Sequence, residues 1–337
     1  MNYLEYFKNT FGISDNPTAL VVPEPPELQS RSAISKCLKR MGFKVYRKYS
    51  IPRHVKPDII VYWNKYRFED LYEYATSNNI ARLEMERGFI NREDYAQIDH
   101  KGFMCESSWA NDITKDPPID GKDRLAKLNL KMPNIEKRDN GYILLLGQLD
   151  NDTQMIHSEI KTVKELAETI IEVQRTIFPL RFRRPASLRL HPLYEGDGES
   201  KQVSPPHDDF QRLKMASVNS NLLNVPITTG TLQEDLRGAK FAISINSNSL
   251  NDALMNGVPC MCFGPHLGNI AGVIKKTSKE TIKDDIIDLN GWTPDRFKVQ
   301  NYFEWLAARQ WNNEEISDPS IMFPLINKAF FERRTIS

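Results

Sequence analysis

The stretch YILLLGQLDND, Tyr142 to Asp152, decides the fold of the second half of the chain. Its apolar run, bounded by a glycine and polar residues, predicts a buried strand. The polar groups that follow lie at the carboxyl end of that strand. Two interpretations remain open for Gln148, Asp150 and Asp152: they form a solvated Asx turn, or they lie at the mouth of an active site.

On both sides of this strand the sequence continues the α/β pattern. The polar segment 131–140, KMPNIEKRDN, has no hydrophobic period and predicts a linker. After the strand, 162–177 has apolar residues at helical spacing. Further strands and helices are predicted at 187–192 (strand), 224–229 (strand), 231–239 (helix), 240–246 (strand), 249–257 (helix) and 258–264 (strand).

The first half alternates short apolar runs with helical patterns in the same way. Strands are predicted at 18–22, 43–49 and 58–63, with a helix at about 32–41, which indicates β/α units on a parallel sheet. The segments 299–313 and 324–334 are predicted as terminal helices with aromatic faces.

This pattern predicts an α/β protein with two Rossmann-like domains that face a cleft. The domains are expected at 1–135 and 141–300, with the helices of 301–337 packing across both. Ligands of such folds bind at the carboxyl ends of the strands, so the polar groups after the strand at 142–147 should face the cleft.

Composition excludes some classes of partner. The 337 residues hold 45 Lys and Arg against 44 Asp and Glu, so no global charge favours nucleic acid or membrane. Cys37, Cys105, Cys260 and Cys262 lack metal-ligand spacing, which is typical of reduced thiols in the cytosol. No apolar run reaches the ~18 residues of a membrane span, and the amino terminus lacks the core of a signal peptide. We therefore expect a soluble, cytoplasmic protein.

Two common nucleotide motifs are absent from the sequence. It has no GxGxxG and no GxxxxGK[ST], which argues against dinucleotide and P-loop binding. The acids of DND, 150–152, are similar to the Asp-x-Asp metal motif of sugar transferases with diphosphate donors. HDDF at 207–210 is a second possible metal cluster, with a polar surface loop as the alternative.

Four segments together resemble the bacterial β-Kdo transferases of capsule polysaccharide biosynthesis. They are LEMERGFINREDYAQIDHKGFMCESS (83–108), ILLLGQLDNDTQMI (143–156), LRLHP (188–192) and AKFAISINSNSLNDALMNGVPCMCFG (239–264). The family patterns are E-D-G-F-hydrophobic-R-S with D-x-x-G, G-Q-x-x-x-D-x-S, K-x-H-P, and S-x-x-G-x-E-A-L-x-x-G-x-P. The resemblance covers roughly residues 80 to 265, as a divergent member with one transferase module.

The matches are made residue by residue. The residues that match the four patterns in order are Glu86, Gly88, Phe89, Asp99 and Gly102, then Gln148 and Asp152, then Arg189, His191 and Pro192, then Ser249, Asp252, Ala253, Leu254, Gly257 and Pro259. Four positions depart from the family: Arg87 replaces its Asp, Asn91 its Arg, Gln154 its Ser and Asp252 its Glu. The first three lie beside the expected sugar site, so the donor sugar need not be Kdo.

The resemblance implies a GT-B-like glycosyltransferase that uses a CMP-activated sugar, Kdo-like or a pentose such as arabinose. The first domain would lie on the acceptor side and the second would hold the nucleotide sugar. Asp152 would act as a nucleophile in a retaining reaction, Glu86 as acid or base, with Gln148 beside them. The single donor phosphate would need cations and hydrogen-bond donors rather than a metal or other cofactor. The expected donor-binding residues are Gly147, Arg189, His191, Ser247, Ser249 and Asp252.

Structural alternatives remain for several of these residues. His191 before Pro192 is also typical of a buried histidine at a strand end. Glu86 is also placed to pair with Arg82 or Arg92. The alternative for Gly88, Gly102 and Gly257 is that they serve only to allow turns with positive φ.

Two basic stretches bear on the acceptor. Residues 36–56 hold eight Lys and Arg, residues 175–189 hold five Arg, and neither stretch has an acid. They are either solvated faces or a surface for a polyanion. The candidate acceptor-binding residues are Lys39, Arg40, Arg47, Lys48, Arg181, Arg183 and Arg184.

The favoured acceptor is hydroxymethylated cytosine in DNA, as in virus-type DNA modification, flipped out of the duplex to react. The alternatives are a capsule or anionic glycolipid glycan, built by a Kdo-type transferase, and a non-catalytic module that binds sugar nucleotides or nucleic acid.

Overall fold

The chain forms two compact α/β units. The computed structural model describes residues 2–22, 30–130, 132, 135, 138, 140–148, 152–174, 180–183, 228 and 231–333. Unit 1 comprises Met1–Leu128 and Phe303–Ser337, and unit 2 comprises Asn129–Tyr302. The predicted α/β class is confirmed. The division into 1–135, 141–300 and 301–337 stays a prediction.

Unit 1 alternates strands and helices in its first part and ends in helices. Its elements are α1 (Tyr3–Phe11), β1 (Thr18–Val21), α2 (Ser30–Arg40), β2 (Lys44–Arg47), β3 (Ile59–Trp63), η1 (Lys65–Arg67), α3 (Glu69–Ser77), β4 (Ala81–Arg87), β5 (Tyr95–Asp99), η2 (Met104–Glu106), η3 (Ala110–Thr114), α4 (Gly121–Lys127), β11 (Trp311–Asn312), α13 (Asn313–Ser317) and α14 (Pro319–Glu332).

Sheet A of unit 1 is mixed: the strands expected at 18–22, 43–49 and 58–63 pair in parallel, as predicted, and two antiparallel strands that were not predicted extend the sheet at one edge. Over the described residues its order is β11-β5-β4-β3-β1-β2. Strands β2, β1, β3 and β4 pair in parallel, whereas β5 is antiparallel to β4 and β11 is antiparallel to β5. The reason lies in residues 88–94, because this short β4–β5 connection cannot make the crossover that a parallel pair needs.

The helix predicted over 299–313 is also shorter than expected. Helix α12 (Arg296–Ala308) ends before Trp311, which enters β11 opposite Ala96. The side chain of Asn312 then caps α13, accepting a hydrogen bond from the Glu315 amide. Burial of Trp311 and this new cap favour a strand and a second helix over continuation of α12.

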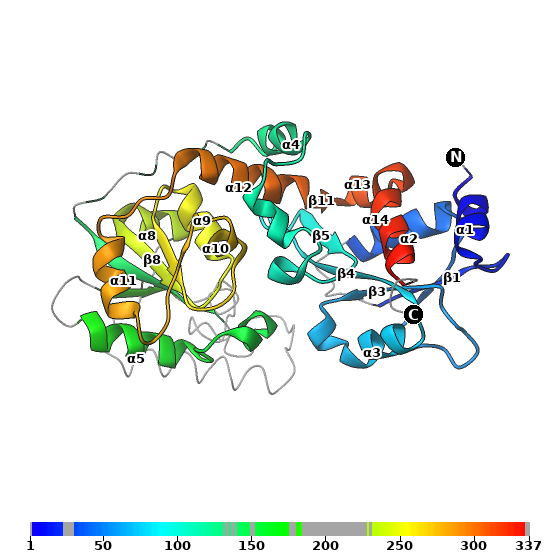
Figure 1. Ribbon diagram of the computed structural model, residues 1–337, viewed down its shortest axis with the longest axis horizontal. Helices are drawn as coiled ribbons and strands as arrows, with labels where there is room; N and C mark the ends of the chain where they lie inside the picture. The colour runs from blue at the N-terminus through cyan, green and yellow to red at the C-terminus, as the bar shows by residue number, and fades with distance from the viewer. Residues whose placement is uncertain are drawn as a thin grey trace, which may run out of the picture. The chain divides into compact units, whose positions relative to one another are not determined.

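Helices cover both faces of sheet A (Figure 1). On one face, α1, α2 and α14 pack against side chains such as Ala19, Val21 and Leu83. On the other face, α3 packs against Leu20 and Ile60. Local sequence fixes the ends of these helices. For example, Gly12 ends α1 at φ 65, a left-handed conformation that glycine adopts without strain.

Unit 2 has a Rossmann-like alternation. Its elements are β6 (Tyr142–Leu146), η4 (Thr153–His157), α5 (Val163–Gln174), β7 (Leu180–Arg183), α8 (Leu232–Gly238), β8 (Ala239–Ser244), α9 (Ser249–Met255), β9 (Cys260–Cys262), α10 (Leu267–Ile270), β10 (Lys275–Lys276), α11 (Ile282–Leu289) and the first part of α12.

Sheet B of unit 2 has the order β10-β9-β8-β6-β7 over the described residues, with every pair parallel. Ile143 on β6 lies opposite Phe241 on β8, and both pack under α5 and α11. The capping box of Thr231 and Glu234 starts α8, which leads directly into β8. Strand β6 is the predicted strand at 142–147, and it lies inside sheet B.

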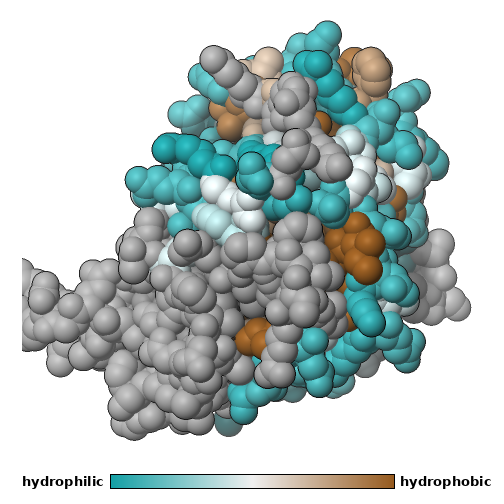
Figure 2. All heavy atoms as spheres, turned by 90° about the vertical axis from the view of Figure 1, so that its left-hand side faces the viewer, coloured by the Kyte–Doolittle hydropathy of each residue, from teal (hydrophilic) through white to brown (hydrophobic). Residues whose placement is uncertain are grey.

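Among the described residues on the face seen in Figure 2, most are hydrophilic, with separate hydrophobic patches. Large hydrophobic side chains that are exposed in unit 2 include Ile287 and Phe297. Within the described part of the chain, no helix combines the length and apolar character that crossing a bilayer requires.

Candidate active site

The carboxyl ends of β6 and β8 bring two amide side chains together in unit 2. The strands are parallel neighbours, with Leu144 opposite Ala242. Gln148 follows the end of β6, and Asn246 follows the end of β8. Parallel strands end at the same edge of a sheet, and ligands of Rossmann-like domains bind at that edge.

The side chain of Gln148 bonds to both the side chain and the backbone of Asn246. Gln148 Nε2 donates to Asn246 Oδ1 at 3.0 Å, and Gln148 Oε1 accepts from the Asn246 backbone amide at 3.3 Å. Their exposed fractions are 5% and 2%. Buried amides with satisfied partners have one orientation, so Gln148 presents its remaining N–H in a fixed direction.

That remaining N–H donates to Asp152. The distance from Gln148 Nε2 to Asp152 Oδ2 is 3.0 Å, and Asp152 Oδ1 accepts from the Gln154 amide at 3.0 Å. The second bond is an Asx turn that starts η4. Asp152 therefore makes the Asx turn that the sequence suggested and also bonds to buried Gln148, while its place in an active site stays a prediction. Each carboxylate oxygen keeps a further acceptor position.

Asn246 was not among the residues predicted from the sequence. Its Nδ2 donates to the Gln154 carbonyl at 2.6 Å, so it ties the segment after β6 to the segment after β8. The absence of a side chain at Gly264 leaves space for it, because a Cβ there would lie 3.0 Å from Asn246 Nδ2. We call Gln148, Asp152, Gln154 and Asn246 the amide network.

Of the predicted donor-binding residues, the structure describes Gly147, Ser247, Ser249 and Asp252. Gly147 is buried between β6 and Gln148, and Ser247 Oγ accepts from the Ser249 amide at 3.3 Å at the start of α9. Asp252 is exposed in the first turn of α9. Arg189 and His191 lie outside the described residues, as do Arg184, Asp150 and the segment 207–210.

Glu86 lies at the corresponding edge of sheet A in unit 1. It is near the carboxyl end of β4, it is 8% exposed, and Asn64 follows the parallel neighbour β3. Asn64 Nδ2 donates to Glu86 Oε2 at 3.2 Å, and the Arg87 amide donates to Glu86 Oε1 at 2.9 Å. The carboxylate of Glu86 is therefore oriented by donors on both oxygens.

Glu84 is a second buried acid on the same face of β4, and no sequence motif pointed to it. It is 2% exposed, and its Oε1 accepts from the Lys65 amide at 2.6 Å. Its Oε2 has no hydrogen-bond partner among the described residues. Burial raises the pKa of Glu84 to about 8, with the nearby carboxylates Glu106 and Glu86 adding to the increase and Lys65 opposing it.

Asp99 and Gly102, which match the D-x-x-G pattern, shape the loop after β5. The two oxygens of Asp99 accept from the amides of Lys101, Gly102 and Ser108 and from the Ser108 hydroxyl, at 2.7 to 3.4 Å. A Cβ at Gly102 would lie 2.8 Å from Glu106 Cβ. Asp99 therefore stabilises the turn through its hydrogen bonds, and Gly102 allows the close approach of Glu106.

Gly88 and Phe89 lie in the β4–β5 connection. A Cβ at Gly88 would lie 2.8 Å from Tyr95 Cβ, so the close approach of the two strands requires glycine there. The amides of Phe89 and Ile90 both donate to Gln310 Oε1, at 2.8 and 2.9 Å. The structure therefore gives Gly88 a packing role.

The candidate acceptor-binding residues of unit 1 are exposed. Lys39 and Arg40 end α2, and Arg47 and Lys48 lie at the end of the edge strand β2. Arg40 donates to the Ser317 carbonyl and Arg47 to the Ser35 hydroxyl. Arg181 and Arg183 belong to β7, at the edge of sheet B in unit 2.

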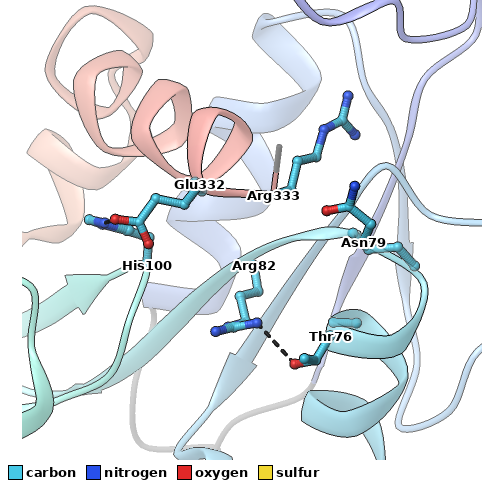
Figure 3. A pocket seen from close by; sticks show the side chains of 9 residues that line it. Thr76, Asn79, Arg82, His100, Glu332 and Arg333 are labelled. Carbon is cyan, nitrogen blue, oxygen red and sulfur yellow. Dashed lines mark hydrogen bonds and ion pairs between the residues drawn. The ribbon is translucent and has the colours of Figure 1, made fainter. Parts of the chain in front are cut away.

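Unit 1 also has a small pocket, which is shown in Figure 3. Its cavity of about 20 Å³ is lined by Arg82, His100, Glu332 and Arg333, among others. Arg82 donates to the Thr76 hydroxyl at 3.0 Å. The cavity holds about one water molecule, so it does not take a nucleotide.

The described residues contain no group of three or more His, Cys, Asp or Glu side chains arranged to hold a metal ion. Metal-independent catalysis stays a prediction, and Asp150 of the DND triplet lies outside the described residues.

Comparison with known proteins establishes the fold. No protein-family model matches the sequence, and no curated protein matches it. Two solved structures of Thermosulfurimonas dismutans KpsC are similar. The beta Kdo 2,7 transferase is 14% identical with a TM-score of 0.53, over 92% of this chain and 99% of its own. The beta Kdo 2,4 transferase is 13% identical with a TM-score of 0.54, over 95% and 99%.

This likeness confirms the predicted GT-B-like fold with two Rossmann-like domains. At such identities it shows the fold alone, so membership of the β-Kdo transferase family stays a prediction.

Proposed function

We propose that this protein is a glycosyltransferase that moves a sugar from a CMP-activated donor to a hydroxyl acceptor. The observation that carries the proposal is the amide network, in which Gln148 and Asn246 hold the Asp152 carboxylate at the carboxyl edge of sheet B. Such a carboxylate is oriented before the substrate arrives, which lowers the cost of reaching the reactive geometry. The GT-B-like fold supports the same reaction class.

The first step is a displacement at the anomeric carbon. An oxygen of Asp152 attacks that carbon, the bond between the carbon and the phosphate oxygen breaks, and CMP leaves with the bonding electrons. The product is a glycosyl ester of Asp152, as in retaining glycoside chemistry. The Gln148 N–H donor on Oδ2 keeps the carboxylate aligned during the attack.

The second step releases the sugar to the acceptor. The acceptor oxygen attacks the anomeric carbon, its proton passes to the Glu86 carboxylate, and the bond to Asp152 breaks to restore the carboxylate. Burial and two donors give Glu86 one orientation, which suits a group that must meet a specific proton.

The donor carries one phosphate, which needs positive charge and hydrogen-bond donors more than a bridging metal. The groups proposed to bind it are Arg189, His191, Ser247 and Ser249, with Gly147 and Asp252 beside them. We propose that neither a metal nor another cofactor takes part.

The acceptor that we favour is DNA with hydroxymethylated cytosine. It is supported by the exposed cations of α2 and β2, Lys39, Arg40, Arg47 and Lys48, in a chain whose net charge is only +1. The fold likeness to Kdo transferases favours instead a capsule or anionic glycolipid glycan, which is the second candidate.

A donor screen tests the reaction class. CMP-Kdo, CMP-arabinose and UDP-sugars are incubated with the protein, and free nucleotide is measured. We expect CMP release by the wild type and a loss of at least 100-fold in Asp152→Asn, which keeps an acceptor for the Asx turn but is not a nucleophile. Asp284→Asn, an exposed Asp of α11, is the matched control and should behave as wild type. UDP release without CMP release would reject the proposed donor.

A further inference from the structure

Asn64 has an unusual backbone conformation for a buried residue. It follows β3, it is 3% exposed, and its φ is 55° with ψ 105°. Positive φ is uncommon outside glycine, and such strain persists only where the surroundings fix it. Glycine would adopt this φ without strain. What asparagine adds at this position is its side chain.

The side chain of Asn64 bonds both to its own turn and to strand β4. Its Oδ1 accepts from the Tyr66 amide at 3.2 Å and caps η1, and its Nδ2 donates to Glu86 Oε2 at 3.2 Å. The cap fixes the plane of the amide, so the N–H that reaches Glu86 has a fixed direction.

The turn that carries Asn64 is anchored to the strand that carries Glu86. The Asn64 amide donates to the Met85 carbonyl at 3.1 Å, and the next amide, that of Lys65, donates to Glu84 Oε1 at 2.6 Å. Met85 and Glu84 directly precede Glu86 on β4. The donor and the carboxylate are therefore parts of one hydrogen-bonded unit, and they keep their relative position.

We propose that Asn64 is the positioning residue for Glu86: its amide holds the carboxylate in the orientation that takes the proton of the attacking hydroxyl. The inference rests on the proposed role of Glu86 in the proposed glycosyltransferase. In this inference, the role of the strained turn after β3 is to place the Asn64 donor next to Glu86. Loss of the donor therefore slows the second displacement and leaves the first, in which CMP departs, at its normal rate.

Three variants separate the donor from the backbone. Asn64→Asp tolerates the same φ and still accepts from the Tyr66 amide, but when ionised it cannot donate to Glu86 and places a second negative charge beside it. Asn64→Gly relieves the strain and loses both side-chain bonds. Asn79→Gly is the matched control, because Asn79 has φ 52 and is exposed in the turn before β4.

The kinetic arm uses a CMP-sugar that the wild type hydrolyses, with water as the acceptor. In Asn64→Asp and Asn64→Gly we expect the burst of CMP to keep its rate while steady-state turnover falls about 10-fold. The glycosyl adduct on Asp152 should then accumulate in the intact-protein mass spectrum. Asn79→Gly should match wild type. Equal turnover in wild type and both Asn64 variants would overturn the inference.

A second arm needs no activity. The Glu86 carboxyl carbon is followed by NMR in protein labelled with ¹³C-glutamate, with the signal assigned from Glu86→Gln. Removing a donor from a carboxylate favours its protonated form, so the titration midpoint should move up by about one pH unit in Asn64→Gly and further in Asn64→Asp, where the added negative charge acts in the same direction. An unchanged midpoint would overturn the inference. Absence of CMP release in wild type, together with a shifted midpoint, would reject the proposed function and keep the contact.

Discussion

Replacement of Glu84 by Gln should change how the stability of unit 1 depends on pH. Glu84 is buried, its Oε1 accepts from the Lys65 amide, and burial raises its pKa from 4.5 to about 8. A Gln side chain keeps an oxygen for the Lys65 amide and cannot ionise. The variant therefore isolates the cost of charging this buried site.

The direction of this pH dependence follows from the linkage between protonation of Glu84 and folding. Because the folded-state pKa is raised, folding favours the protonated acid, and this stability is fully present below about pH 4.5. It is lost as the pH rises through about 8. At about 1.4 kcal/mol per pKa unit the full loss has an upper limit of about 5 kcal/mol. About 2 kcal/mol of it falls between about pH 6 and about pH 8.

Urea unfolding at these two pH values measures the difference. Tryptophan fluorescence reports mainly on unit 1, which holds Trp63, Trp109, Trp305 and Trp311 of the five tryptophans. Wild type should lose about 2 kcal/mol more than Glu84→Gln between pH 6 and pH 8. Glu73→Gln, an exposed acid on α3, serves as the control and should follow wild type. Parallel pH dependence in wild type and Glu84→Gln would refute the reasoning.

Three further predictions concern the proposed reaction. Asn246→Ala removes the side-chain acceptor of Gln148 and the donor to the Gln154 carbonyl but keeps the backbone bond to Gln148, so CMP release should fall about 10-fold or more, and a wild-type rate would count against the amide network. Activity should survive EDTA; loss that Mn²⁺ restores would show a metal requirement. Replacing Arg181, Arg183 and Arg184 by Ala should flatten the salt dependence of binding to hydroxymethylcytosine DNA by about 0.9 per lost phosphate contact. Donor hydrolysis should be unchanged in that variant, and an unaltered slope would remove these residues from the acceptor surface.

The alternation of apolar runs and helical periods was sufficient to predict two α/β domains, because Rossmann-like units repeat that pattern along the chain. It predicted the parallel strands β1, β2 and β3 but not the antiparallel edge formed by β5 and β11. Tyr95–Asp99 has the same apolar period in either direction, and only the length of its connection to β4 makes it antiparallel. Trp311 at the end of a helical pattern gave no sign of a strand two residues long.

The sequence predicted those residues of the candidate site that belong to a recognisable motif. Gln148 and Asp152 follow a clear strand, and the structure joins them. Asn64 and Asn246 were missed because an asparagine in a polar turn has the same appearance whether it is solvated or bonded to a buried partner. Glu84 was missed because its burial depends on the turn at Lys65, which lies 19 residues earlier in the chain.

The return of the chain to sheet A sets an order for folding during synthesis. Strand β11 and helix α14 supply Trp311, Met322, Ile326 and Phe330 to the core that Phe7 begins. At roughly 5–20 residues per second, they follow Leu128 off the ribosome after about 10 to 40 s. Over that interval β5 has an unpaired edge and the core around Phe7 lacks its cover, so a nascent chain stalled within unit 2 should recruit chaperones through unit 1.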